Sequence, residues 1–483
     1  MHTADFLGWA GLRGVQMHLS VEVRASGLGG VGIFARTTAD EDAVVLRVPR
    51  SCVFDLRNFF QLAEKLKAGD ATQLAAAILN AALHAGGPAS ESVIIRSFVW
   101  GLFMLRQKRR LINVPGIEQI DAYLQVLATT PTLDIEELAE EADAVEGDLR
   151  AEKRLVERDF ARLASDCPEA GTLMSLAQAF QLHQAVKSRV LEIPQAEPDL
   201  DDYDYCTNIS LVPVLDFANH AHANNAVFDV DPESNDVILR LVARVPAGTE
   251  ITICYDPANA VEPFLKTYGF VPKGPCTAAW PIPDLDASLT EAVGGNDYSA
   301  IAKWLQVRPE LPIRVDAAGA VAIDSANLRL PLLLIPGLAY YRAWATETAD
   351  IAREFGETEE ETADIIAELR RQETHAPVVQ ASDTVFGVTW HDSYISLSHI
   401  LEQTGTKTER AVLELATRTA EVIRRIAHGP GPGGVRGPEQ RPGAGGPLGQ
   451  YRQLQAQISD RLSRMSAEEI TRVAHEAVEN LLR

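Results

Sequence analysis

Two short groups of residues carry side chains that could bind a small molecule and act on it. The first follows the apolar run 211–215 and consists of Asp216, Asn219 and His220. A carboxylate, an amide and an imidazole together offer both donors and acceptors of hydrogen bonds. An apolar run that ends in such a group is typical of a buried strand or core segment that delivers side chains to a site.

The second group ends the stretch 250–255, in which isoleucine alternates with threonine and cysteine before Tyr255. This period of two predicts a β-strand, and the dipeptide Asp256-Pro257 predicts a turn directly after it. A further tyrosine follows in the string Tyr-Gly-Phe at 268–270. We expect both polar strand ends and this string to contribute to one pocket.

A glycine-rich string, residues 27–32, lies between two stretches that favour strands. Gly27, Gly29 and Gly32 match the dinucleotide-binding fingerprint, which requires a helix directly after it. Ile33 and Phe34 favour a strand there instead. We therefore expect a turn between strands, which is either a plain hairpin turn or a turn whose backbone approaches a ligand, as glycine permits.

The order of these elements resembles the SET-domain protein methyltransferases, and most of all the Rubisco large-subunit lysine methyltransferase class. In that class a glycine turn, an Asn-His pair after an apolar strand, a strand ending in a tyrosine and a Tyr-Gly-Phe string follow one another. The resemblance implies an α+β fold, in which a SET-domain β-fold with a helical insertion precedes an all-α C-terminal domain. It also implies that this last domain docks the substrate.

The resemblance and the composition divide the chain into four expected parts. Residues 1–56 would form the SET N-terminal part, and 57–205 the helical insertion with a cofactor-flanking helix. Residues 206–275 would form the SET C-terminal part with the catalytic tyrosine. Residues 285–483 would form the helical C-terminal domain, with a disordered loop at 428–449 that is rich in glycine and proline. The proline-containing stretch 272–284 would be a linker.

The resemblance further implies roles for individual residues. Tyr255 would be catalytic and would also contact the cofactor, S-adenosylmethionine. The other cofactor contacts would be Gly30, Val31, Gly32, Arg189, Asp216, Asn219 and His220. The substrate pocket would be lined by Leu191, Leu215, Phe217, Tyr268 and Phe270. Taken alone, Arg189 also fits a solvated charge at a helix end, and Asp216 also fits a cap or turn.

Two of the pocket positions bear on the acceptor. A related enzyme that methylates histidine carries asparagine and tryptophan where this chain has Leu191 and Leu215. The two leucines therefore favour lysine as the acceptor.

The composition excludes some classes of function. A formal net charge of −23 argues against a nucleic-acid binder, which needs a basic face. The same charge favours a basic, lysine-bearing protein partner, or serves solubility alone. Five widely spaced cysteines without a Cys-x-x-Cys predict free thiols in the cytoplasm or nucleus and no metal site. We also expect no signal peptide, no membrane span and a monomer.

Three functions follow from these observations. The first is an S-adenosylmethionine-dependent protein-lysine N-methyltransferase that acts on a non-histone protein. The second is a binding module with a degenerate SET fold and no catalysis. The third is a nicotinamide-dependent oxidoreductase, which would need a helix after Gly32.

Overall fold

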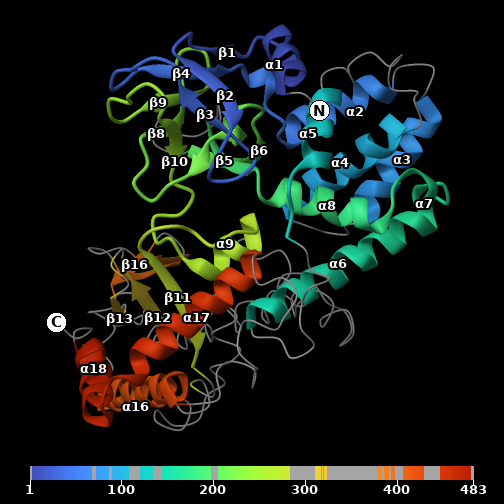
Figure 1. The fold of residues 1–483 in the computed structure, drawn as a ribbon. Coiled ribbons are helices and arrows are strands. Elements are labelled where there is room, and N and C mark those ends of the chain that lie inside the picture. Colours follow the sequence, from blue (N-terminus) through green and yellow to red (C-terminus); the bar gives the residue numbers. More distant parts are fainter. Residues whose placement is uncertain are drawn as a thin grey trace. The chain divides into compact units, whose positions relative to one another are not determined.

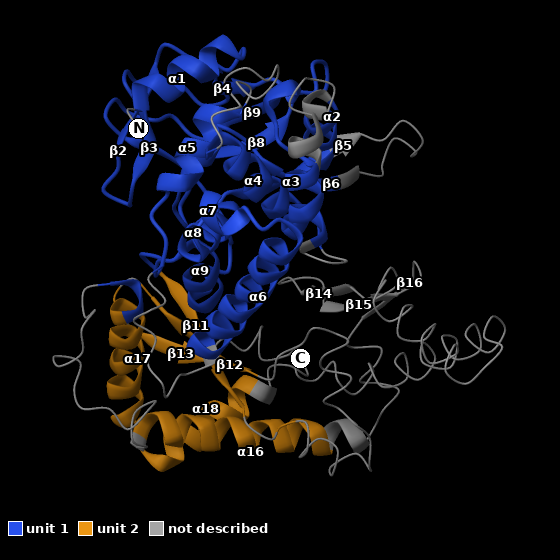
Figure 2. Cartoon of the chain, turned by 90° about the vertical axis from the view of Figure 1, so that its right-hand side faces the viewer, with its two compact units in different colours: residues 1–274, 445–448 blue, residues 275–444, 449–483 orange. Residues whose placement is uncertain are grey.

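The computed structural model describes most of the N-terminal half of the chain and parts of the C-terminal half. The described residues are 3–67, 72–85, 90–107, 120–133, 144–196, 205–282, 285, 310–316, 318, 320–323, 378–381, 386–390, 393–396, 406–428 and 446–479. The chain divides into two compact units (Figures 1 and 2). Unit 1 comprises residues 1–274 and 445–448, and unit 2 comprises residues 275–444 and 449–483.

Unit 1 contains the β-strands and helices that position the candidate site. Its strands are β1 (Gln16–Met17), β2 (Val21–Ala25), β3 (Val31–Ala35), β4 (Val44–Val48), β5 (Val190–Ala196), β6 (Tyr205–Leu211), β7 (Asn219–His220), β8 (Ala226–Val230), β9 (Val237–Leu241) and β10 (Glu250–Ile253). Its α-helices are α1 (Thr3–Leu12), α2 (Leu56–Lys67), α3 (Thr72–Ala85), α4 (Glu91–Gln107), α5 (Asp121–Thr129), α6 (Ala144–Asp166), α7 (Ala170–Leu173), α8 (Leu176–Lys187) and α9 (Val261–Tyr268). Two short 3-10 helices are η1 (Arg50–Cys52) and η4 (Leu215–Phe217).

The described strands of unit 1 form two four-stranded sheets and a hairpin. The sheets have the orders β1-β4-β9-β8 and β2-β3-β10-β7, and β5 pairs with β6. In β9, Val237, Leu239 and Leu241 are buried while the residues between them are partly exposed. This alternation is the mark of a strand with one face on the core. The two sheets lie on one side of unit 1, and the helices from α2 to α8 lie on the other (Figure 1).

Strand β10 is the element that joins distant parts of the site. It runs antiparallel to β3, where Glu250 pairs with Phe34, and parallel to β7, where Ile253 pairs with His220. The glycine turn precedes β3 and the Asn-His pair forms β7, so β10 holds both beside the tyrosine that follows it. β3 occupies the place where a dinucleotide-binding fold needs a helix, and the nicotinamide hypothesis is therefore wrong.

The helical layer is packed around α4, which is buried on all sides from Ile95 to Leu105. A helix that is apolar around its whole circumference is typical of a central core element. Its one buried cation, Arg96, pairs with Asp159 of α6 at 2.9 Å. Gly101 allows α3 to approach, because a Cβ there would lie 2.8 Å from Cδ2 of Leu79.

Unit 2 contains both helices and strands. Its strands are β11 (Cys276–Pro281), β12 (Glu310–Val315), β13 (Val321–Ile323), β14 (Val378–Ala381), β15 (Phe386–Trp390) and β16 (Ser393–Ser396). They form the antiparallel sheets β11-β12-β13 and β14-β15-β16. Its helices are α16 (Thr406–His428), α17 (Pro447–Ser463) and α18 (Ala467–Glu479).

Several local expectations differ from this architecture. The C-terminal region is helical at its end but not all-α, and the expected linker at 272–284 contains the strand β11. The expected helical insertion at 57–205 includes β5, because the helix α8 ends at Lys187. Residues 429–445 of the expected disordered loop lie outside the described residues, and its last residues belong to α17.

No helix in the described part of the chain is long and apolar enough to cross a membrane.

The close approach of α3 and α4 predicts that Gly101→Val destabilises unit 1. The added side chain would be forced against Leu79, and overpacking of this kind costs about 1–3 kcal/mol of unfolding free energy. Gly147 in α6 has nothing within 4 Å of an added Cβ, so Gly147→Val should leave stability nearly unchanged. Denaturant unfolding of both variants measures the difference, and equal midpoints would contradict the close packing at Gly101.

Candidate active site

Tyr255 is held by both its backbone and its hydroxyl at the end of β10. Its N–H donates to Nδ1 of His220 at 3.1 Å, and its hydroxyl donates to the carbonyl oxygen of Ala218 at 2.8 Å. Because Nδ1 of His220 accepts, Nε2 carries the hydrogen and donates to Oδ1 of Asn259 at 3.0 Å. Burial lowers the pKa of His220 and keeps its ring neutral. Asn259 therefore holds the ring of His220, and Nδ1 of that ring positions the backbone of Tyr255.

The chain reaches Asp216 through a strained turn. Val214 has φ +73° and ψ −43°, a region that β-branched residues rarely adopt. The residue is fully buried, and the following turn is closed by the N–H of Asp216, which donates to the carbonyl oxygen of Val212 at 3.1 Å. Packing thus maintains a strained backbone conformation at Val214. The chain turns there, at the end of the apolar segment 211–215, and Asp216 lies beside the cavity.

Arg189 and Asp216 form a buried pair next to Tyr255. Nη1 of Arg189 donates to Oδ2 of Asp216 at 2.8 Å and to its carbonyl oxygen at 3.1 Å. Nε of Arg189 donates to Oγ1 of Thr130 at 3.1 Å, and the hydroxyl of Tyr123 donates to Oδ2 of Asp216 at 2.8 Å. A planar guanidinium can satisfy these acceptors at once, which a lysine could not. In the described structure Oδ1 of Asp216 is buried and has no hydrogen-bond partner.

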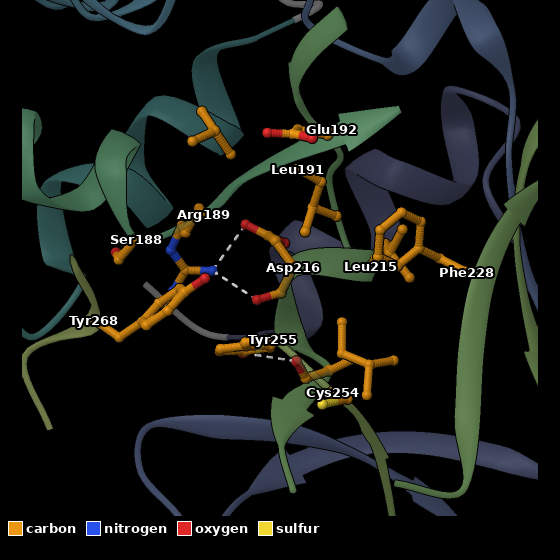
Figure 3. Close-up of a pocket in the computed structure, with 13 residues that line it drawn as sticks. Ser188, Arg189, Leu191, Glu192, Leu215, Asp216, Phe228, Cys254, Tyr255 and Tyr268 are labelled. Carbon is orange, nitrogen blue, oxygen red and sulfur yellow. Dashed lines mark hydrogen bonds and ion pairs between the residues drawn. The ribbon is translucent and has the colours of Figure 1, made fainter. Parts of the chain in front are cut away.

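A cavity of about 340 Å³ lies beside this pair. It is lined by Ser188, Arg189, Val190, Leu191, Glu192, Leu215, Asp216, Ala218, Phe228, Ile253, Cys254, Tyr255 and Tyr268. Figure 3 shows the guanidinium of Arg189 reaching Asp216 near Tyr268, while Leu215 and Phe228 lie on the opposite side. The cavity therefore has one charged wall and one apolar wall, with Tyr255 between them.

An aromatic cluster supports the two tyrosines. The rings of Tyr255 and Tyr268 have centroids 4.7 Å apart. Phe270 packs behind them, 6.1 Å from Tyr268 and 5.4 Å from Phe264. Burial raises the pKa of Tyr268 and holds that of Tyr255 well above the ordinary 10.0. Both hydroxyls are therefore protonated near neutral pH.

The glycine turn is tied to Asn219 of β7, although β10 lies between β7 and β3 in the sheet. Nδ2 of Asn219 donates to the carbonyl oxygen of Val31 at 3.0 Å and to Oε1 of Glu250 at 2.7 Å. Within the described residues nothing donates to Oδ1 of Asn219, which is left as an acceptor. Gly30 has φ +57°, and a Cβ there would meet nothing within 4 Å. The backbone of the turn is thus open to a ligand at Gly30.

The structure brings part of the predicted site together at the cavity. The predicted residues that line it are Arg189, Leu191, Leu215, Asp216, Tyr255 and Tyr268. Three others, Val31, Gly32 and Asn219, meet around Glu250, and Gly30 precedes them in the same turn. His220 lies against Tyr255, with ring centroids 5.3 Å apart.

Two predicted pocket residues do not line the cavity. Phe217 is buried and packs edge-on against Phe6 at 5.3 Å, and Phe270 stands behind Tyr268. Conversely, Phe228 of the cavity wall and the hydroxyl of Tyr123 were not among the predicted site residues. Each reaches the site through the packing of an element far away in the chain.

An ion-pair network supports the helices that lead into the cavity. Glu152 of α6 lies 2.6 Å from Nε2 of His183 and 2.8 Å from Nζ of Lys187, both on α8. Lys187 also donates to the carbonyl oxygen of Lys266 in α9 at 3.0 Å. The loop after α8 carries Arg189, and α9 ends at Tyr268. Glu152 therefore holds the end of α8 directly, and through Lys187 it links α8 to α9.

Among the described residues, no group of three or more His, Cys, Asp or Glu side chains could hold a metal ion.

The fold is that of a SET-domain protein. A crystal structure of the SET domain of LSMT, bound to MeLysine and AdoHcy, superposes with a TM-score of 0.50 at 16% identity. The superposition covers 99% of this chain and 92% of that one. At this level of identity the likeness concerns the fold alone, and it confirms the resemblance to the Rubisco methyltransferases on which the fold prediction rested.

The chain belongs to the Ctm1 family, described as cytochrome c lysine N-methyltransferase 1, whose profile matches residues 3–372. The protein of that name from Eremothecium gossypii is 34% identical over 227 residues, which cover 45% of this chain and 46% of that protein. The one from Saccharomyces cerevisiae is 30% identical over 151 residues, 29% of this chain and 26% of that protein. The alignments thus span less than half of each relative.

The Glu152 network predicts a pH-dependent contribution to stability. Burial lowers the pKa of His183 below 6.5. Burial alone would raise the pKa of Glu152, but the hydrogen bond from His183 and the charge of Lys187 lower it below 4.5. The pKa values of both groups are lower in the folded state than in the unfolded state. The stabilisation from each group is therefore complete above its unfolded pKa, 6.5 for His183 and 4.5 for Glu152, and is lost as the pH falls through the folded pKa.

Glu152→Gln should therefore lower the unfolding free energy at pH 7 by about 1–3 kcal/mol, because a half-buried ammonium loses its carboxylate. It should also flatten the pH dependence below pH 4.5. Urea unfolding between pH 4 and 8 measures both effects. Glu157→Gln, on the same helix and without a described ion pair, is the control. A Glu152→Gln variant as stable as this control at every pH would show that the network is not needed.

Proposed function

We propose that this protein is an S-adenosylmethionine-dependent protein-lysine N-methyltransferase and that its substrate is cytochrome c. The membership in the Ctm1 family and the names of the relatives support the reaction and the substrate. The SET fold supports the same class of enzyme. The matched stretches cover less than half of each relative. The reaction and the substrate are therefore both part of the proposal.

The observation that carries the proposal is the position of Tyr255. Its hydroxyl is partly buried, protonated and fixed on the carbonyl oxygen of Ala218 at the side of a cavity with one charged and one apolar wall. Transfer of a methyl group to an amine requires accurate alignment of the two reactants and little covalent chemistry by the protein. A fixed hydroxyl and aromatic rings can provide that alignment.

The residues present fit S-adenosylmethionine, which supplies a methyl group on a cationic sulfonium. Oδ1 of Asp216 is a buried acceptor without a described partner, and Oδ1 of Asn219 is a second available acceptor. The open backbone at Gly30 would let the turn contact the cofactor, and Arg189 would face its carboxylate. These groups complement a ligand that carries both an ammonium and a carboxylate.

The apolar wall suits the acceptor amine. A lysine in water is protonated near neutral pH and cannot act as a nucleophile until it loses that proton. Leu191, Leu215 and Phe228 would desolvate the ammonium and lower its pKa. Tyr255 is itself protonated, so it orients the amine and leaves the proton to be lost to water.

Lysine is the acceptor that these walls favour, and a basic protein is the partner that the net charge of −23 favours. The cavity offers leucine at positions 191 and 215, where the histidine-specific relative has an amide and an indole. The proposal also places the enzyme in the cytoplasm or nucleus as a monomer. In its support, Cys52, Cys167, Cys254 and Cys276 are free thiols.

Tyr255→Phe should abolish most turnover and spare cofactor binding. The ring and its packing remain, but the hydroxyl that orients the amine is lost, which costs roughly 3–4 kcal/mol of barrier or a hundred- to a thousandfold in rate. Asn219→Ala should show the opposite pattern and weaken S-adenosylmethionine binding, because its contacts exist in the ground state. Single-turnover kinetics and calorimetric titration measure both. Near-normal turnover of Tyr255→Phe would remove the tyrosine from the mechanism.

Incubation with labelled S-adenosylmethionine should transfer methyl groups to lysine in cytochrome c. The apolar walls at Leu191 and Leu215 are the reason for expecting lysine and not histidine. Mass spectrometry of the purified product identifies the modified residue, and cytochrome c with that lysine changed to arginine is the control. Methyl-histidine as the sole product would contradict lysine as the acceptor. If the enzyme labelled other proteins in a cell lysate but not cytochrome c, the proposed substrate would be wrong.

A further inference from the structure

We propose that Glu250 is a positioning residue that fixes the amide of Asn219 and the glycine turn in the orientation that the cofactor requires. The inference rests on the proposed function, since it concerns the same site. Glu250 begins β10, the strand that ends next to Tyr255, and its side chain is partly buried between three segments of the chain.

The contacts of Glu250 join these segments. Oε1 accepts from Nδ2 of Asn219 at 2.7 Å, and the hydroxyl of Ser26 lies 2.8 Å and 2.9 Å from the two carboxylate oxygens. Oγ of Ser26 in turn accepts from the N–H of Leu28 at 2.9 Å, inside the glycine-rich turn. The carboxylate of Glu250 thereby holds both Ser26, at the start of the glycine turn, and the side chain of Asn219 on β7.

The carboxylate also decides which way the amide of Asn219 faces. Glu250 can only accept, and so can the carbonyl oxygen of Val31, 3.0 Å from the same Nδ2. Both amide hydrogens are therefore committed to the protein, and Oδ1 faces away from these acceptors. Without Glu250 the amide would be held by the carbonyl oxygen of Val31 alone, through one hydrogen bond instead of two. Glu250 thus reinforces the orientation in which Asn219 is an acceptor.

Gly32 shows how closely this arrangement is packed. A Cβ at Gly32 would lie 2.1 Å from Oε1 of Glu250 and 3.0 Å from Nδ2 of Asn219. The backbone at Gly32 does not have a positive φ, so its conformation alone would accept alanine. A side chain at position 32 would instead displace the carboxylate of Glu250. This dependence makes Gly32 and Glu250 a coupled pair that a double-mutant cycle can measure.

The experiment compares Glu250→Ala, Glu250→Gln and Gly32→Ala with the unaltered chain by calorimetric titration with S-adenosylmethionine. Glu250→Ala should weaken binding roughly tenfold, because an amide donor loses its acceptor. The KM for the cofactor should rise while kcat at saturation stays nearly unchanged. Glu250→Gln should keep most of the affinity, since its amide oxygen can still accept from Asn219. Glu22→Gln, a change at a partly exposed residue of β2 that pairs with Arg24, is the charge control.

The cycle supplies the decisive comparison. Gly32→Ala should weaken binding severalfold in the unaltered chain and have little further effect in the Glu250→Ala background, where the space has been opened. Equal effects in both backgrounds, or unchanged affinity in Glu250→Ala, would overturn the positioning role. If Glu250→Gln bound S-adenosylmethionine as weakly as Glu250→Ala, the positioning role would also be overturned. That result would mean that the charge of Glu250 attracts the ligand directly. Failure of the unaltered chain to bind S-adenosylmethionine would instead remove the proposed function.

Discussion

The parallel pairing of β7 with β10 is the constraint on which the rest of the site depends. It sets Asn219 opposite Thr252 and His220 opposite Ile253. With this register, His220 can accept from the N–H of Tyr255, and Asn219 can reach the carboxylate at the start of the same strand. A shift of one residue would turn each of these side chains to the opposite face. Tyr255 and the glycine turn are therefore positioned by one short strand pair.

The polar groups around this pair are costly to bury, and the surrounding structure satisfies most of them. Arg189 is satisfied by Asp216 and Thr130, while Tyr123 donates its hydroxyl to the same aspartate. Removal of one partner from such a network leaves an uncompensated buried group. Oδ1 of Asp216 is buried without a described partner, and Asp216 is one of the residues that line the cavity. The strained backbone of Val214 lies two residues before Asp216, in the turn that leads to this network.

The C-terminal region shows where composition was an unreliable guide. Prolines at 272–284 indicated a linker, yet Cys276–Pro281 forms a strand that pairs along its full length with Glu310–Val315. A proline at the end of a strand is compatible with pairing, because the missing N–H matters only where the ladder needs a donor. The partner strand lies about thirty residues away along the chain, so no local pattern indicated the pairing. The helices at the end of the chain have strong apolar periodicity and were predictable from it.

The sequence was sufficient to predict the SET fold and Tyr255 as the end of a strand, because these depend on short strings in a fixed order and on a period of two. It was also sufficient to propose Arg189, Asp216 and Asn219 as neighbours of a ligand. Their actual partners were decided by tertiary structure. Glu250, Phe228 and Tyr123 reach the site through strand register and helix packing between segments tens to hundreds of residues apart. Periodicity reports only which face of its own element a residue occupies, and the identity of the group opposite is set when the elements pack.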